Sequence, residues 1–402
     1  MTPTLDLTAS DALALRMASL QLAASDAVPV PDGVAGIVQW FGALQGQDLA
    51  SLQWSLGLRL PGSTLADIEA ALEAGEVLRT WPMRGTIHLV PAQDARWMLR
   101  VLGVKPLAGA AKRREYLGLS ERDADRAVDL LGSALAGGGR LTRAECIDVL
   151  VAGGVDGAGQ RGYHLLWYAS QHGVTCIAPS VKGEQTFVLL DDWAPAPRDL
   201  SREEALSTIA LRFFRSHGPA TRKDFAGWTG LTVGDVKAGI AGCGDELVAV
   251  RVEGVEMVMA ASLADVLPGS SGVAAAAVVP EWLALPGFDE YLLGFKDRSL
   301  VVDAAGMAAV IPGRNGVFRS TLGRDGRVVG TWKRVVGAKV VTVDVAPLLR
   351  LTMGEQRRAE EAWRPYAAFL GRSLDVQIRP TRAGTAASRA PSKGARPPTG
   401  SS

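Results

Sequence analysis

The sequence of 402 residues has few of the side chains that bind metals or form disulfides. Its three cysteines, Cys146, Cys176 and Cys243, are widely spaced, and no CxxC pair occurs. This spacing argues against a structural zinc site and against a disulfide framework. The four histidines are also dispersed, without an HExxH motif, which argues against a metal hydrolase. We therefore predict no metal and no other cofactor, and a reducing compartment.

Long hydrophobic runs and a strong charge of either sign are absent as well. The most apolar run, residues 273–279, is far too short to cross a bilayer. The N-terminal residues 1–6 lack the basic and apolar regions of a secretory signal. The formal net charge is only +1, so any binding to nucleic acid needs a local basic patch. We expect a cytoplasmic protein that does not bind membranes.

The patterns of apolar residues and helix caps predict an α+β protein built from tandem winged-helix (helix-turn-helix) modules. Three modules are expected, over residues 1–118, 119–198 and 199–272, each with helices followed by a hairpin or wing. In the second module, residues 159–171 are the candidate recognition helix. The phrase Thr221-Arg222-x-Asp224 repeats the phrase Thr142-Arg143-x-Glu145, and both are typical of a capped helix start.

The C-terminal part has a different character. Residues 273–380 are predicted to form a small β-rich domain with one helix over residues 354–370. Strands are expected at residues 300–302, 308–311, 317–321, 327–332, 339–343 and 374–378. Residues 381–402 are rich in Ala, Gly, Ser and Pro and carry only basic charges, which predicts a disordered basic tail.

Two glutamines separated by one glycine, Gln45-Gly46-Gln47, follow an apolar helical pattern. An amide has one acceptor oxygen and an NH₂ donor group, so it can hold a water molecule but cannot take up a proton as a carboxylate does. A pair of amides therefore suits a reaction whose leaving group is already cationic, such as an N7- or N3-alkylated purine leaving deoxyribose. The alternative for so short a motif is a pair of backbone caps.

Four phrases in this order resemble the AlkZ/YcaQ family of bacterial DNA glycosylases. They are residues 44–47 (LQGQ), 81–90 (WPMRGTIHLV), 285–300 (LPGFDEYLLGFKDRSL) and 325–332 (DGRVVGTW). The resemblance implies a C-shaped scaffold of tandem winged helices with a small β-domain, and DNA on the concave face. The family motif is Gln–apolar–Gln in the AlkZ-like branch and ends in Asp in the YcaQ-like branch. Gln47 therefore places this chain on the AlkZ-like side.

The resemblance also implies an activity. A DNA glycosylase of this kind hydrolyses the N-glycosidic bond of alkylated purines in double-stranded DNA and unhooks interstrand crosslinks, in DNA repair or genotoxin resistance. Gln45 and Gln47 are then the catalytic residues. No lysine near these motifs is a clear Schiff-base nucleophile, so we expect a monofunctional enzyme, acting as a monomer.

Basic residues near these motifs are candidates for DNA contact. Arg84 and His88 lie on the predicted wing of the first module, with a surface arginine and a half-buried strand histidine as the structural alternative. Arg314, Arg319 and Arg324 surround a predicted hairpin and could follow phosphates, or they are solvated loop residues. Residues 112–114 (KRR) form another candidate patch, with a solvated helix face as the stronger alternative.

Two other classes of function remain open at the sequence level. The chain could be a non-catalytic winged-helix DNA-binding protein, a regulator or lesion binder, in which the glutamines serve only as a cap. It could also be a scaffold for partner proteins with vestigial DNA surfaces. Loss of base release with unchanged DNA affinity, on substitution of the glutamines, separates the enzyme from the binder.

Overall fold

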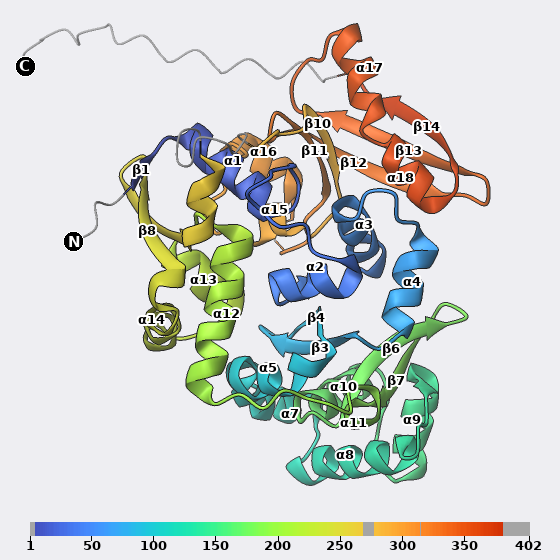
Figure 1. Ribbon diagram of the computed structural model, residues 1–402. Helices are drawn as coiled ribbons and strands as arrows, with labels where there is room; N and C mark the ends of the chain where they lie inside the picture. The colour runs from blue at the N-terminus through green and yellow to red at the C-terminus, as the bar shows by residue number, and fades with distance from the viewer. Residues whose placement is uncertain (1–4, 268–276, 314, 381–402) are drawn as a thin grey trace, which may run out of the picture.

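A computed structural model describes residues 5–267, 277–313 and 315–380 of the chain. It is a mixed α/β structure with three sheets surrounded by helices (Figure 1). The predicted tail at 381–402 and the candidate residue Arg314 lie outside the described residues. No helix in the described part of the chain is long and apolar enough to cross a membrane.

The N-terminal region is helical and leads into a hairpin. Its helices are α1 (Ala9–Ser19), α2 (Gly33–Phe41), α3 (Leu49–Arg59) and α4 (Leu65–Glu73). The short strand β2 (Leu44–Gln45) lies between α2 and α3, and the hairpin is formed by β3 (Val77–Met83) and β4 (Thr86–Pro91). The hairpin confirms the strand pattern seen in the sequence. Pro82 lies where the pairing of β3 with β4 shifts register, as expected for a residue without an N–H group.

The next region contributes to two cores, since the buried residues of its first helix belong to the main core and its later helices pack around a second one. Its helices are α5 (Ala95–Leu102), α6 (Val104–Ala108), α7 (Ala110–Leu117), α8 (Glu121–Leu135), α9 (Arg143–Ala152), α10 (Gln160–Gln171) and α11 (Leu190–Trp193). Its strands are β5 (Leu141–Thr142), β6 (Thr175–Val181) and β7 (Glu184–Leu189). Helix α10 is largely buried from His164 onward, so it does not present a free face along its length as a recognition helix requires.

One six-stranded sheet joins these two regions, in the order β2-β4-β3-β6-β7-β5. The link between the hairpins is the antiparallel pairing of Arg79 in β3 with Ile177 in β6. Local patterns in the sequence predict each hairpin but not this pairing, because the two strands are separated by nearly a hundred residues. The sheet fixes the segment that carries Gln45 against the second region.

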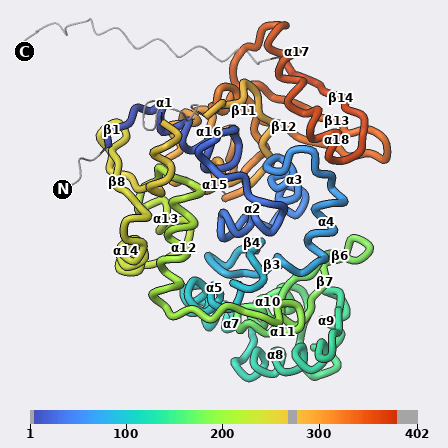
Figure 2. The backbone as a smooth tube through the Cα atoms, viewed as in Figure 1, coloured from blue at the N-terminus to red at the C-terminus, as the bar shows by residue number. Residues whose placement is uncertain are grey.

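The third region contains α12 (Arg202–His217), α13 (Arg222–Thr229) and α14 (Val233–Gly242), followed by the hairpin of β8 (Leu247–Val252) and β9 (Val255–Ala260). The Thr221 hydroxyl oxygen accepts the backbone N–H of Asp224 and caps α13, while the Asp224 carboxylate accepts the backbone N–H of Thr221, which confirms the predicted capping box. Strand β1 (Leu5–Leu7), from the start of the chain, pairs in parallel with β8, and the two strands lie together in Figure 2. The N-terminal segment therefore packs on the third region.

The C-terminal sheet has five strands, in the order β10-β11-β12-β13-β14. These are β10 (Trp282–Leu285), β11 (Ser320–Arg324), β12 (Arg327–Val336), β13 (Val340–Pro347) and β14 (Ser373–Ile378). The helices of this region are α15 (Glu290–Leu293), α16 (Ala304–Val310), α17 (Met353–Glu361) and α18 (Arg364–Leu370).

Three expectations for this region were wrong. Residues 300–302 do not form the expected strand, because the chain makes a turn at residues 299–301 before helix α16 begins. The strand expected at 308–311 is part of helix α16, because the Asp303 side chain accepts the backbone N–H of Gly306 and starts a helix there. The single helix expected at 354–370 is two helices. The helix is interrupted at Trp363, and Pro365 lies in the first turn of α18. Trp363 is fully buried at this break.

A buried ion pair connects the N-terminal helices to the C-terminal region. The guanidinium of Arg59 in α3 donates to both carboxylate oxygens of Asp289, at 2.8 and 2.9 Å, and Ser55 donates a further hydrogen bond at 2.7 Å. Burial opposes the charge on Asp289, but Arg59 and these hydrogen bonds still hold the pKa of its carboxyl below the usual range. This ion pair therefore joins α3 to the residue that precedes α15.

Replacing Asp289 by Ala should lower the free energy of unfolding by about 3–5 kcal/mol, because Arg59 is left buried without its counter-charge. The matched control is Asp199→Ala, which removes an exposed ion pair with Arg100 and should change stability by less than about 1 kcal/mol. Urea unfolding at pH 7 measures both. Equally small changes in the free energy of unfolding would show that the buried pair does not connect the N-terminal helices to the C-terminal region.

Candidate active site

The Gln45–Gln47 segment is held between a strand and a helix. Helix α2 ends at Gly42, whose φ of 84° reverses the chain into β2. Gln45 then pairs with His88 of β4, and Gly46 donates its N–H to the carbonyl of Ile87 at 2.9 Å. Asp48 caps α3, accepting the Ser51 backbone N–H at 3.2 Å, so this carboxylate serves the helix start.

Backbone groups fix both glutamine side chains through their oxygens. The Gln45 Oε1 accepts the N–H of Gln47 at 2.8 Å, and the Gln47 Oε1 accepts the N–H of Ile87 at 3.3 Å. Within the described residues, neither Nε2 group makes a hydrogen bond to protein. Gln45 is half-buried and Gln47 is exposed. Each amide thus keeps two N–H donors and one oxygen lone pair for a bound molecule.

A hydrogen bond from a buried arginine holds the peptide between the two glutamines. The guanidinium of Arg79 in β3 donates to the carbonyl of Gly46 at 3.0 Å. Arg79 is buried, and this desolvation lowers its pKa to about 10, so it stays charged at neutral pH. A buried cation on this carbonyl restrains the turn between the two amides.

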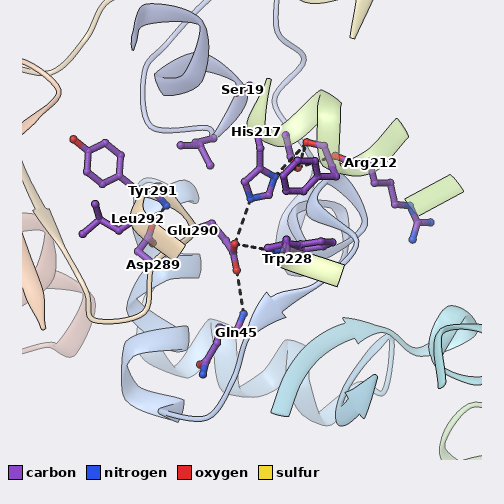
Figure 3. A network of polar contacts seen from close by, with 12 residues as sticks. Ser19, Gln45, Arg212, His217, Trp228, Asp289, Glu290, Tyr291 and Leu292 are labelled. Atoms are coloured by element: carbon purple, nitrogen blue, oxygen red, sulfur yellow. Dashed lines mark hydrogen bonds and ion pairs between the residues drawn. The ribbon is translucent and has the colours of Figure 1, made fainter. Parts of the chain in front are cut away.

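A buried carboxylate, Glu290 at the start of α15, is the centre of the polar network in Figure 3. Its Oε1 accepts the backbone N–H of Gln45 at 3.4 Å, and its Oε2 accepts the indole N–H of Trp228 at 3.0 Å. The Nε2 of His217 lies 3.3 Å from the same Oε2. The Gln45 side chain points away from Glu290 (Figure 3), so the network holds the Gln45 backbone and leaves its amide free.

Gln45 lines a cavity of about 360 Å³ between the β3–β4 turn, α13 and the segment after α15. Trp228, Phe288, Phe295 and Phe318 provide apolar walls. Three cations also line it, Arg84, Lys296 and Arg298. Asp224 is the acidic residue there, but its oxygens already accept the backbone N–H groups of Thr221 and Lys296. The cavity therefore combines an amide, aromatic faces and positive charge, which suits a nucleotide with its phosphates.

The structure brings Arg84 and His88 to this site in different roles. Arg84 is exposed in the β3–β4 turn, with a φ of 56°, and its Nη2 lies 3.2 Å from Nε2 of His88. His88 is fully buried, and its Nδ1 lies 2.9 Å from the carbonyl oxygen of Thr86. Its ring therefore contacts Arg84, and only the arginine is open to a ligand.

The two described hairpin arginines are not brought together with the glutamines. Arg319 is exposed and its guanidinium donates to the carbonyl of Ala309 at 3.4 Å. Arg324 is half-buried and forms an ion pair of 2.6 Å with Glu355 at the start of α17. An arginine neutralised in this way has less positive charge to offer to a phosphate.

Sequence patterns did not single out Glu290, Lys296, His217 or Trp228 as functional residues. Glu290 lies within the phrase at 285–300, but no individual role was predicted for it. A signal was present in principle, since Glu290 is an acidic residue inside an apolar stretch, and buried charges need partners. Those partners come from distant segments, which the sequence alone does not place together.

Within the described ranges, no group of three or more His, Cys, Asp or Glu side chains is placed to hold a metal ion. The three cysteines are all buried and free.

Comparison with known proteins defines the class of protein to which this fold and site belong. A family model described as DNA glycosylase AlkZ-like matches residues 38–369, a range that includes Gln45, Gln47 and Glu290. The chain therefore belongs to the AlkZ-like family of DNA glycosylases.

Two matches come from Streptomyces sahachiroi. An interstrand DNA cross-link repair glycosylase is 27% identical over 317 residues, which are 74% of this chain and 81% of that protein. The solved structure of the DNA glycosylase AlkZ matches with a TM-score of 0.74 at 23% identity, covering 93% of this chain and 100% of that chain. This likeness supports the mixed α/β fold over nearly the whole length.

The environment of His88 predicts how stability depends on pH. Burial, and then the nearby charge of Arg84, lower the pKa of His88 to about 3, against about 6.5 in an unfolded chain. Between these values the unfolded chain binds a proton that the folded chain does not. The free energy of unfolding should therefore fall as the pH drops below about 6.5, by up to about 1.4 kcal/mol per pH unit.

Urea unfolding of the wild type and of His88→Gln at pH 7 and pH 5 isolates this contribution. The wild type should lose about 2 kcal/mol more than the variant between the two pH values. The same loss in both proteins would show that His88 is not held neutral by its surroundings.

Proposed function

We propose that this protein hydrolyses the N-glycosidic bond of purines that carry a positive charge after alkylation at N7 or N3. The observation that carries the proposal is the pair of free glutamine amides, held by backbone hydrogen bonds, of which Gln45 lines an aromatic and basic cavity. A cationic base leaves without prior protonation, so neutral amides suffice where other glycosidases need a strong acid.

In this mechanism the amides of Gln45 and Gln47 position the attacking water and contact the sugar as it gains oxocarbenium character. Glu290 acts as a positioning residue, because it binds the Gln45 backbone and no atom expected to react. Arg79 supports the same turn through the Gly46 carbonyl. The site needs no metal and no other cofactor for this chemistry.

The DNA is proposed to lie across the cavity, with its phosphates near Arg84, Lys296 and Arg298. Arg319 is exposed and can add a contact at the side of Phe318, while Arg324 contributes less because Glu355 neutralises it. His88 acts through Arg84 and makes no DNA contact of its own. Lys296 is assigned to phosphate binding and not to a Schiff base, so the enzyme is proposed to be monofunctional. A borohydride-trapped adduct on Lys296 would contradict that assignment.

The scaffold for this binding is proposed to be a C-shaped series of winged helices, at 1–118, 119–198 and 199–272, with the β-rich domain at 273–380. Helices followed by a two-stranded hairpin recur three times and support it, as in α12, α13 and α14 followed by β8 and β9. A monomer suffices, because one chain supplies the amides, the cavity and the cations.

Interstrand crosslinks are proposed as a second substrate. The Streptomyces sahachiroi relative is named for interstrand DNA cross-link repair. A crosslink formed through N7 of two purines carries the same cationic linkage as a simple adduct. Release of one purine therefore requires no chemistry beyond that proposed above, and this supports a role in repair of, or resistance to, crosslinking agents.

Base release from a duplex with one N7-methylguanine, under single-turnover conditions, tests the proposal. The wild type should release the base, and the double variant Gln45→Ala, Gln47→Ala should do so at least about 100-fold more slowly, as expected when positioning of a reactant is lost. A duplex with an N7-linked interstrand crosslink is assayed in parallel.

The affinity of both proteins for the same duplexes serves as the control and should agree within a few-fold. Unchanged turnover in the double variant contradicts the catalytic assignment. Absence of release by the wild type, with DNA binding intact, would favour a non-catalytic DNA-binding protein.

A further inference from the structure

A second cavity, of about 350 Å³, lies beside the first and has an aromatic lining. We name it the aromatic pocket, and its defining residues are Arg84, Pro106, Arg113, Tyr163, His164 and Trp167. Its size is within the roughly 300–1,000 Å³ typical of small-molecule sites. Arg84 lines both this pocket and the cavity of Gln45. A group bound here is therefore next to the proposed reaction site.

The rim of the pocket is formed by a tyrosine that is both exposed and restrained. Tyr163 is 39% exposed, yet its hydroxyl oxygen accepts the indole N–H of Trp81 at 3.3 Å. The guanidinium of Arg143 lies over its ring, 5.2 Å from the centroid. An aromatic ring that is open to solvent and fixed in orientation is suited to stacking, because little side-chain entropy is lost when a ligand binds.

The pocket wall next to Tyr163 contains two stacked rings, one of which has a polar atom without a hydrogen-bond partner among the described residues. The rings of His164 and Trp167 are 5.3 Å apart and 28° from parallel. Nε2 of His164 is buried and has no hydrogen-bond partner within the described residues. A buried polar atom without a partner is costly, and in a pocket wall a ligand can supply that partner. Burial and then Arg114 and Arg113 lower the pKa of His164 to about 4, so the ring is neutral at pH 7.

The charges at the pocket mouth indicate what kind of molecule enters. Arg84 and Arg113 are both exposed there, and Arg113 donates a hydrogen bond to the neutral amide of Gln160. Positive charge beside flat aromatic surfaces favours a planar aromatic ring that is attached to a phosphate backbone. The largely buried helix α10 thus contributes the wall of a pocket in place of a recognition surface.

We infer that the aromatic pocket binds a planar aromatic group of the DNA substrate, stacked on Tyr163 next to the reaction site. The inference rests on the proposed glycosylase function for its biological role. A planar aromatic group of this kind can come from two parts of the substrate. It is either an unstacked nucleobase near the lesion or an aromatic substituent carried by the alkyl adduct.

Two duplexes of the same sequence distinguish these sources, one with N7-methylguanine and one with an N7-arylmethylguanine at the same position. Tyr163→Ala is compared with wild type and with Tyr163→Phe, which keeps the ring. The matched control is Tyr116→Ala, which removes a tyrosine that is 78% exposed, has Arg113 over its ring and is not part of the pocket. Affinity and single-turnover base release are measured for every combination.

Tyr163→Ala should bind at least one duplex about tenfold or more weakly, as expected for a lost stacking partner, while Tyr163→Phe and Tyr116→Ala should bind as wild type does. A loss confined to the arylmethyl duplex assigns the pocket to the adduct. A loss with both duplexes assigns it to a nucleobase. Equal affinity of Tyr163→Ala and wild type for both duplexes overturns the inference.

Failure of the proposed function gives a different result. In that case the wild type releases no base from either duplex. The affinity measurements still test the aromatic pocket, because they do not depend on turnover.

Discussion

The buried carboxylate of Glu290 constrains the site more than any other single group. It is almost fully excluded from solvent, and a charge in that position persists only when hydrogen bonds replace the lost water. Its partners come from three separate segments, namely Gln45 in β2, His217 at the end of α12 and Trp228 in α13. The arrangement of these three segments, and with it the position of Gln45, therefore depends on one side chain.

Asp289, the preceding residue, has a complementary part in the fold. It pairs with Arg59 of α3, while Glu290 contacts α12, α13 and β2. These adjacent carboxylates lie in the C-terminal region and thus join it to the N-terminal segments and to the third region. A cavity formed between these segments keeps its shape only while these contacts are intact. This arrangement explains why so polar a cluster lies inside an otherwise apolar core.

Features set by local chemistry were predictable from the sequence. The capped start of α13, the β3–β4 hairpin and the β11–β12 turn depend on neighbouring residues, and the structure has all three. The strand expected at 308–311 was wrong because the capping residue Asp303 lies outside the apolar run that suggested it. Pairing of Arg79 with Ile177, which builds the six-stranded sheet, has no local signal at all.

The same division applies to the site. The motif Gln45-Gly46-Gln47 could be proposed from residue chemistry and family resemblance, and its catalytic role remains a prediction. The burial of His88, the pairing of Arg324 with Glu355 and the position of Lys296 follow from tertiary contacts, so the sequence could not supply them. Glu290 is the clearest example, because its neighbours in space are far away in the chain.

The central claim is that Glu290 acts on catalysis by holding the Gln45 segment. A double-mutant cycle of Glu290→Gln and Gln45→Ala, measured as single-turnover release of N7-methylguanine, tests it most directly. If Glu290 works through Gln45, each single variant is slow and the double variant is hardly slower than Gln45→Ala alone. Losses that multiply in the double variant, with DNA affinity and folding unchanged, would show that Glu290 acts independently and would contradict the account.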